Sequence, residues 1–146
     1  MTVFELRQDQ AAALIAHAVE EAPNECCGML AGRHGRVEKI YRVTNAHHSS
    51  LTYLMDKDEQ LAALNDMEAA GLDLIAMYHS HTISPAYPST TDESNAYYPE
   101  TPDTHYVALY PGVVYVIVSL ASPEAPAIRA FHLTDGKIAE ERVVVR

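Results

Sequence analysis

The stretch that decides the fold is LDLIAMYHSHTISPAYPSTTD, residues 72–92. Its first half is a nearly continuous apolar run that ends in polar residues, a pattern typical of a central strand buried on both faces. Residues two apart on a strand point to the same face, so we expect His79 and His81 to project together while Ser80 points the other way. Because α/β folds tend to build their sites at the carboxyl ends of central strands, this pair predicts a functional site.

The second half of the stretch predicts the start of a helix. Ser89 suits the N-cap, and Asp92 follows three residues later, where a carboxylate meets the free N–H groups of the first turn. That turn can pack back over the strand end and bring Asp92 to the two histidines. Two imidazoles and one carboxylate with a fourth position open are the ligand set of a catalytic zinc. The alternative is purely structural: the histidines are polar residues leaving a sheet, and Ser89 and Asp92 only cap a helix.

The rest of the chain predicts strands interleaved with helices. Apolar periodicity and stop signals predict helices over 9–23, 56–71 and about 89–97. Strands are expected at 26–32, 36–46, 50–55, 72–81 and 113–120, followed by a terminal hairpin at 127–145 whose turn is Asp135-Gly136. This order predicts an α/β sandwich with a mixed β-sheet flanked by helices. At 146 residues we expect one domain spanning 1–146.

Composition excludes some classes of function. The formal charge of −10 argues against nucleic acid, whose phosphates require a basic face. No apolar run reaches the roughly 18 residues of a membrane span, and the first ten residues, MTVFELRQDQ, do not resemble a secretory signal, so a cytoplasmic protein is expected. The neighbouring cysteines, Cys26 and Cys27, do not have the spacing of a zinc or redox pair and are interpreted as reduced thiols. No feature of the sequence indicates the oligomeric state.

The pattern His-Ser-His, seven residues, Ser, two residues, Asp resembles the JAMM motif of the MPN-domain metalloproteases, and the proline of AYPS also fits. The segment NECCGMLAG, residues 24–32, is similar to the first motif of that family. The resemblance covers most of the chain and implies an MPN-like, cytidine-deaminase-like fold. It implies Zn²⁺ bound by His79, His81 and Asp92, with Glu25 as the catalytic acid/base and Ser89 stabilising the oxyanion. Without the resemblance, Glu25 is one of 20 acidic residues with nothing to distinguish it.

Finer features are similar to the small bacterial members of the family that act on sulfur-carrier proteins: YHSHT, AYPSTTD, YVIVSL and IRAFHLTDGKI. They imply a zinc hydrolase that cleaves the amide bond after the carboxyl-terminal glycine of a ubiquitin-like sulfur-carrier protein with a Gly-Gly tail, and that releases cysteine. Such a tail is expected to lie beside an exposed strand. Two alternatives stay open, a broader isopeptidase acting on protein conjugates and a non-catalytic MPN scaffold. The segment 97–106 looks like an insertion relative to these members.

Overall fold

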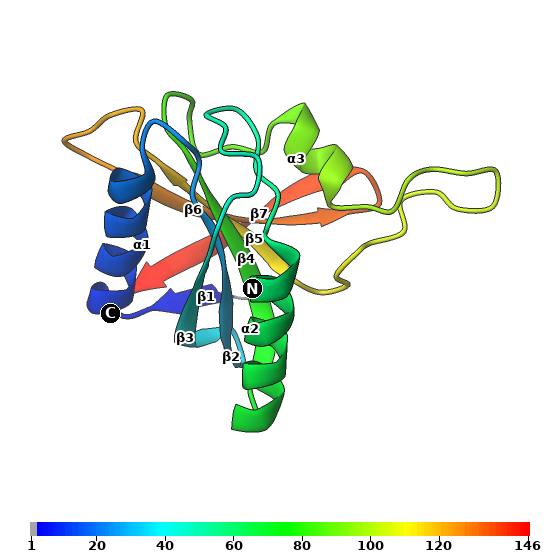
Figure 1. The fold of residues 1–146 in the computed structure, drawn as a ribbon, viewed down its shortest axis with the longest axis horizontal. Coiled ribbons are helices and arrows are strands. Elements are labelled where there is room, and N and C mark those ends of the chain that lie inside the picture. The colour runs from blue at the N-terminus through cyan, green and yellow to red at the C-terminus, as the bar shows by residue number, and fades with distance from the viewer. Residues whose placement is uncertain (1–2) are drawn as a thin grey trace.

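The computed structural model describes residues 3–146, which form seven strands interspersed with three helices (Figure 1). The order is β1 (Val3–Leu6), α1 (Gln8–Glu21), β2 (Cys27–Arg33), β3 (Arg36–Val43), α2 (Lys57–Ala70), β4 (Asp73–His81), α3 (Thr90–Asn95), β5 (Val114–Ser119), β6 (Ala127–Thr134) and β7 (Lys137–Val145). The predicted α/β class is therefore confirmed, and the predicted central strand 72–81 is β4.

The sheet is mixed, as expected, but it closes into a barrel instead of forming a layer of a sandwich. The strand order is β1-β3-β2-β4-β5-β6-β7, and β1 pairs in parallel with both β3 and β7. β4 and β5 also run parallel, whereas the remaining pairs are antiparallel. The predicted sandwich is wrong because β1, a four-residue strand that the sequence analysis did not predict, joins the two ends of the sheet. Closure of this kind removes the unpaired edges that an open sheet exposes.

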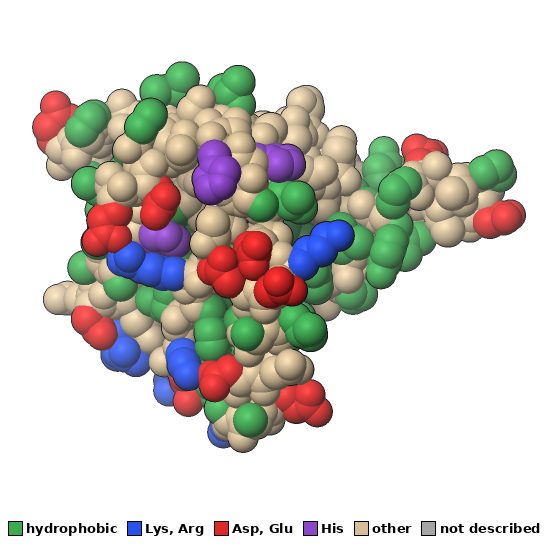
Figure 2. Space-filling view, in the orientation of Figure 1, with side chains coloured by type: hydrophobic (Ala, Val, Ile, Leu, Met, Phe, Trp, Pro, Cys, Tyr) green, Lys and Arg blue, Asp and Glu red, His purple; other side chains and the backbone are tan. Residues whose placement is uncertain are grey.

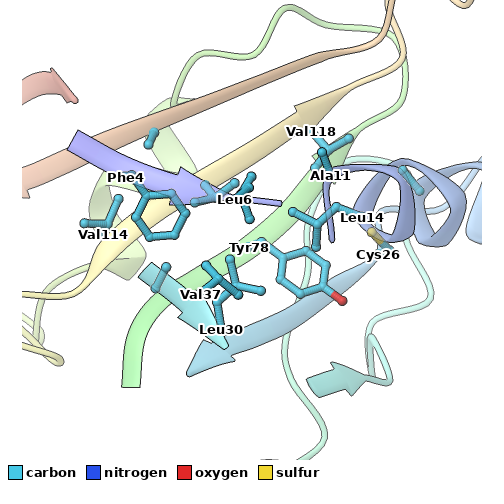
Figure 3. Close-up of a cluster of buried hydrophobic side chains, with 14 residues drawn as sticks. Phe4, Leu6, Ala11, Leu14, Cys26, Leu30, Val37, Tyr78, Val114 and Val118 are labelled. Atoms are coloured by element: carbon cyan, nitrogen blue, oxygen red, sulfur yellow. The ribbon is translucent and has the colours of Figure 1, made fainter. Parts of the chain in front are cut away.

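β4 is buried on both faces, which explains its nearly continuous apolar sequence. On one face, Tyr78 belongs to a cluster of buried side chains from α1, β1 to β5 and β6 (Figure 3). On the other face, Met77 belongs to a second cluster that includes residues of α2. Since side chains alternate along a strand, His79 and His81 share the face of Met77.

The close packing of β2 on β4 requires a glycine. Gly28 lies opposite Tyr78 in the β2–β4 pairing. A Cβ at Gly28 would lie 2.4 Å from the backbone oxygen of Tyr41 and 2.4 Å from the Tyr78 ring. The absence of a side chain at Gly28 therefore leaves room for Tyr78, whose hydroxyl reaches His17 Nδ1 at 2.8 Å.

Several predicted elements differ from the observed ones; the strand predicted over 36–46, for example, ends at Val43. Residues 50–55, predicted as a strand, are irregular apart from a single bridge between Asn45 and Met55. The helix expected over about 89–97 is shorter, since α3 ends at Asn95. After it, residues 97–108 form a loop that projects from the body of the protein and is closed by a bridge between Tyr97 and Ala108 (Figure 1).

The surface reflects the acidic composition. On the face shown in Figure 2, Lys and Arg side chains lie in small groups beside carboxylates and form no continuous basic area. Across residues 3–146, the three helices are all too short or too polar to cross a membrane.

Candidate metal centre

The two histidines of β4 point into the same site, as their spacing predicts. His79 and His81 are both buried, and their Nε2 atoms lie 3.1 Å apart. Ser80 faces the opposite side, where its Oγ accepts a hydrogen bond of 2.7 Å from the backbone N–H of Cys26. The alternation of the strand therefore separates the histidine pair from the packing against α1.

The start of α3 brings a carboxylate to this pair. Ser89 is the N-cap of the helix, and its Oγ accepts a hydrogen bond from the backbone N–H of Asp92 at 3.0 Å. The backbone N–H of Ser89 donates in return to Asp92 Oδ2 at 2.9 Å. The same Oδ2 lies 3.1 Å from His79 Nε2 and 3.1 Å from His81 Nε2. The structure thus places the three predicted ligands in one group, with the donor atoms at the corners of an equilateral triangle.

This triangle fits a divalent ion. Donor atoms of a tetrahedral zinc site lie about 3.3 Å apart when each is about 2.0–2.1 Å from the ion. The Nδ1–H of His81 donates to the backbone oxygen of Pro85 at 2.8 Å, which leaves the lone pair of Nε2 facing the site. Two imidazole nitrogens and a carboxylate oxygen that point to one position form a donor set for a metal once the nitrogens carry no proton.

The charge states suit the same role. Burial opposes ionisation of Asp92, but hydrogen bonds from His79 and His81 outweigh it and hold the pKa of the carboxyl well below its usual range. Burial lowers the pKa of His79, which favours the neutral imidazole. A carboxylate and a neutral imidazole are the protonation states that metal binding requires. Burial also lowers the pKa of His81, but hydrogen bonds with Asp92 and the Pro85 oxygen outweigh it and raise the pKa, so an ion that binds there would displace a proton.

Glu25 lies at the amino end of β2 and is 5% exposed. Its Oε1 atom is buried and has no hydrogen-bond partner among the described residues. Burial raises the pKa of this carboxyl to about 7, with smaller contributions from His81, which lowers the pKa, and Asp92, which raises it. Two members of the candidate group, His81 and Asp92, are therefore among the charges that act on this carboxyl. A buried carboxyl with a free oxygen atom and a pKa near neutrality is suited to accept and return a proton.

Ser89 has an observed role and an expected one. The observed role is that of the helix N-cap, which was the structural alternative for this residue. In that role the Oγ atom accepts a hydrogen bond, so the hydroxyl proton stays free for another acceptor. Its contribution to an oxyanion site stays a prediction, and the two roles are compatible.

The chain between β4 and α3 is anchored on β5. The backbone N–H of Leu120 donates to the oxygen of His81 at 2.9 Å. Ser119 Oγ donates to the oxygen of Ser84 at 2.6 Å. These contacts hold the loop 82–88, and with it the Pro85 oxygen that orients His81.

Three further histidines and the two cysteines make contacts outside this group. His17 contacts Tyr78, His105 contacts Glu100, and His132 contacts Glu141. Cys26 and Cys27 form no disulfide and are fully buried, and burial raises the pKa of their thiols to about 11 and about 12. Thiols that ionise only at such pH are poor nucleophiles near neutrality.

Two residues of the site were not assigned by the sequence analysis. The ring of Tyr53 stacks on the ring of His79, and the side chain of Asn45 contacts the backbone of Glu25. Both belong to an irregular segment without periodicity, so no spacing signal marks them. Asn45 lies inside the predicted strand 36–46, whereas the observed β3 ends at Val43, and nothing in the sequence marked this residue as a support of the site.

Comparisons with known proteins show what the whole chain is similar to. The chain is 39% identical, over 145 residues, to the CysO-cysteine peptidase of Mycobacterium tuberculosis (strain ATCC 25618 / H37Rv), covering 98% of this chain and 91% of that protein. It is 46% identical over 82 residues to the "Probable TtuB-protein conjugate cleaving protease" of Thermus thermophilus, covering 56% of this chain and 55% of that protein. The solution structure of protein DSY2949 from Desulfitobacterium hafniense superposes with a TM-score of 0.82 at 32% identity, covering 99% of this chain and 93% of that one.

The match to a protein family covers most of the chain. Residues 7–134 match the family described as prokaryotic homologs of the JAB domain, and this range contains every strand of the site as well as Glu25, Ser89 and the three grouped ligand residues. On that evidence, together with relatives aligned over nearly its whole length, the chain belongs to the prokaryotic homologs of the JAB domain.

Proposed function

We propose that this chain is a zinc metallopeptidase that hydrolyses the amide bond after the carboxyl-terminal glycine of a ubiquitin-like sulfur-carrier protein and releases cysteine. The observation that carries the proposal is the group formed by His79, His81 and Asp92, two of whose charges act on the buried carboxyl of Glu25. The relative named CysO-cysteine peptidase, which aligns over 98% of this chain, supports the substrate class. The region 1–146 would act as one domain, and the cytoplasmic location expected from the sequence stays a prediction.

His79, His81 and Asp92 would hold the ion. Zinc supplies Lewis acidity, which polarises a carbonyl group and makes water easier to deprotonate. Three protein ligands would leave a fourth position open, as in catalytic rather than structural zinc sites.

The remaining steps fall to the side chains of this protein. Glu25, ionised at and above its pKa of about 7, takes the proton of the attacking water through its unpaired oxygen. As the C–N bond breaks, Glu25 returns that proton to the leaving amine. The second proton of the water, left on the hydroxyl added to the carbonyl carbon, also passes to the amine, so the products are the carboxylate of the carrier glycine and the ammonium group of cysteine, and atoms and charge balance. The Ser89 hydroxyl donates its free proton to the oxygen that becomes negative on the carbonyl carbon.

The closed sheet limits where the carrier tail can lie. The catalytic end of β4 pairs with β2 on one side, where His79 faces Cys27, and with β5 on the other, where His81 faces Ser119. The tail therefore cannot add to β4 as a new strand. The segments that border the site, 46–55 and 82–88, are irregular and carry exposed apolar side chains at Leu51 and Ile83. The tail would pass between these segments, and glycines at its end lack the Cβ that would obstruct a close approach to the ligand group.

The test is mass-resolved cleavage of a sulfur-carrier protein whose terminal Gly-Gly is followed by cysteine. We expect a mass loss of one cysteine residue with the zinc-loaded protein, no loss after chelation, and recovery when zinc is returned. An unchanged substrate mass with fully zinc-loaded protein would overturn the proposal.

A second candidate is a broader isopeptidase, favoured by the relative named as a TtuB-protein conjugate cleaving protease. A carrier joined to a protein lysine, offered beside the cysteinyl carrier, separates the two. Faster cleavage of the lysine-linked conjugate would select the isopeptidase. Cleavage of neither substrate by metal-loaded protein would select the non-catalytic scaffold.

A further inference from the structure

The two histidines of the metal-ligand group are oriented in different ways. Imidazole ligands are usually held by a hydrogen bond from the ring nitrogen that does not face the metal. His81 follows this rule through its Nδ1 contact with Pro85. His79 does not, because its Nδ1 atom is buried without a hydrogen-bond partner among the described residues. Another contact must therefore fix the plane of the His79 ring.

The ring of Tyr53 makes that contact. Its centroid lies 4.5 Å from the centroid of the His79 ring, and the two planes are inclined by 23°, a stacked arrangement. His81 meets His79 edge-on instead, with centroids 4.9 Å apart and planes inclined by 63°. A ring stacked on one face and met by an edge cannot tilt freely about its Cβ–Cγ bond. The stacking of Tyr53 thus holds the His79 ring in the orientation that places its Nε2 atom 3.1 Å from Asp92 Oδ2.

The buried amide of Asn45 contacts the segment that carries Tyr53 on both sides of this residue, beside a backbone hydrogen bond of 2.7 Å from the N–H of Ala46 to the oxygen of Leu54. Asn45 Nδ2 donates to the oxygen of Thr52 at 3.0 Å, and Asn45 Oδ1 accepts from the N–H of Leu54 at 3.1 Å. Both neighbours of Tyr53 are therefore bonded to the same side chain. Asn45 Nδ2 also donates to the backbone oxygen of Glu25 at 3.1 Å, and Oδ1 accepts from the N–H of His47 at 3.0 Å. With its donors and acceptor all used, Asn45 connects the Tyr53 segment to the residue that carries the proposed acid/base.

We propose that Tyr53 is a positioning residue for His79, and that Asn45 fixes the Tyr53 segment relative to Glu25. The inference rests on the metal centre of the proposed function. It assigns the orientation of the ligand His79 to an aromatic ring, whereas that of His81 is set by a hydrogen bond.

The first test compares Tyr53→Phe with Tyr53→Leu. Each variant is stripped of metal with a chelator, and its binding of added metal is then measured. The readouts are zinc affinity, measured by competition with a chromophoric chelator, and the visible absorption spectrum of bound Co²⁺. Phe keeps the stacked ring, so affinity and spectrum should match those of the wild type. Leu removes the ring and should weaken affinity by about 10–100-fold, the usual effect of losing a group that orients a ligand, and change the Co²⁺ spectrum. Tyr98→Leu, on the exposed projecting loop, is the matched control and should bind as the wild type does.

The second test asks whether Asn45 acts through Tyr53. Asn45→Ala should also weaken zinc affinity. The fold-loss of affinity in the double variant Asn45→Ala/Tyr53→Leu should be much smaller than the product of the two single fold-losses, because both substitutions remove the same support. Thermal unfolding of the metal-free variants shows whether each is folded. A Tyr53→Leu protein that is folded and binds zinc as tightly as the wild type overturns the role of Tyr53. Single effects that simply multiply in the double variant overturn the role of Asn45.

The two proposals fail in different ways. His79→Ala should abolish tight zinc binding, and wild-type affinity in that variant would overturn the metal centre itself. Loss of binding in His79→Ala combined with unchanged binding in Tyr53→Leu would overturn only the positioning role. Neither readout depends on cleavage of a carrier protein.

Discussion

Ser89 and Asp92 hold each other at the start of α3 through two reciprocal hydrogen bonds, from Asp92 N–H to Ser89 Oγ at 3.0 Å and from Ser89 N–H to Asp92 Oδ2 at 2.9 Å. The carboxylate oxygen fixed in this way is the one that meets His79 and His81. A helix cap and a ligand position are therefore built from the same two side chains. Structural and functional interpretations of this motif do not exclude each other.

The two roles of Ser89 can be separated by substitution. At an N-cap, glycine costs only a few tenths of a kcal/mol, whereas alanine costs about 0.5–2 kcal/mol. Both remove the hydroxyl, and the loss of one oxyanion donor lowers kcat by about 10²–10³-fold. We expect Ser89→Gly and Ser89→Ala to lose activity alike but to differ in stability, measured by urea unfolding, while Ser89→Thr keeps both properties. Full kcat in Ser89→Gly would contradict the oxyanion role.

Glu25→Gln should retain zinc and lose activity. The amide cannot accept the proton of water, and removal of a general base typically lowers the rate by about 10²–10⁴-fold. Zinc content by atomic emission and cleavage of the cysteinyl carrier are the two measurements. His81→Ala is the control that should lose zinc and activity together. The acid/base role would be refuted by a Gln variant that works at the wild-type rate.

The stability of the metal-free protein should depend on pH through Glu25. Burial raises the pKa of this carboxyl from 4.5 to about 7, so the folded state binds its proton more tightly than the unfolded state does. The resulting stabilisation is complete below about pH 4.5 and is lost as pH rises through about 7. Glu25→Gln resembles the protonated form, so its advantage over the wild type in free energy of unfolding should grow across this window. Denaturant unfolding in excess chelator at pH 5 and pH 8 measures the effect, and an equal difference at the two pH values would refute it.

Tyr78→Phe should destabilise the protein without affecting the metal centre. The hydroxyl of Tyr78 contacts His17 Nδ1 at 2.8 Å in the interior, on the face of β4 opposite the ligand histidines. Its removal leaves a buried ring nitrogen unpaired, at a cost of about 1–3 kcal/mol. Chemical unfolding gives the stability change, and zinc competition should give the wild-type affinity. Unchanged stability would mean that the contact contributes nothing to the fold.

The sequence alone could predict the position of each member of the candidate group on its own element, because these positions are local, but not that the two elements meet. The two-residue repeat of a strand put His79 and His81 on one face, and the N-cap position of Ser89 put Asp92 in the first turn of the next helix. The run 72–81 was also recognisable as a buried strand, since a strand with apolar side chains on both faces must be packed against other elements on both sides. Glu25 was found only through the resemblance to a family, because an acidic residue before a strand has no periodic signal of its own.

Only the tertiary structure decided how the sheet ends and what supports the site. The short strand β1 closes the barrel by pairing with β3 and β7, and its four residues are too few to show a periodicity. Tyr53 lies against His79 because Asn45 ties its irregular segment to Glu25, and these contacts join residues up to 26 positions apart. A local pattern of apolar residues reports which face of an element is covered, but not which distant segment covers it. That choice is made by packing and hydrogen bonding across the whole fold.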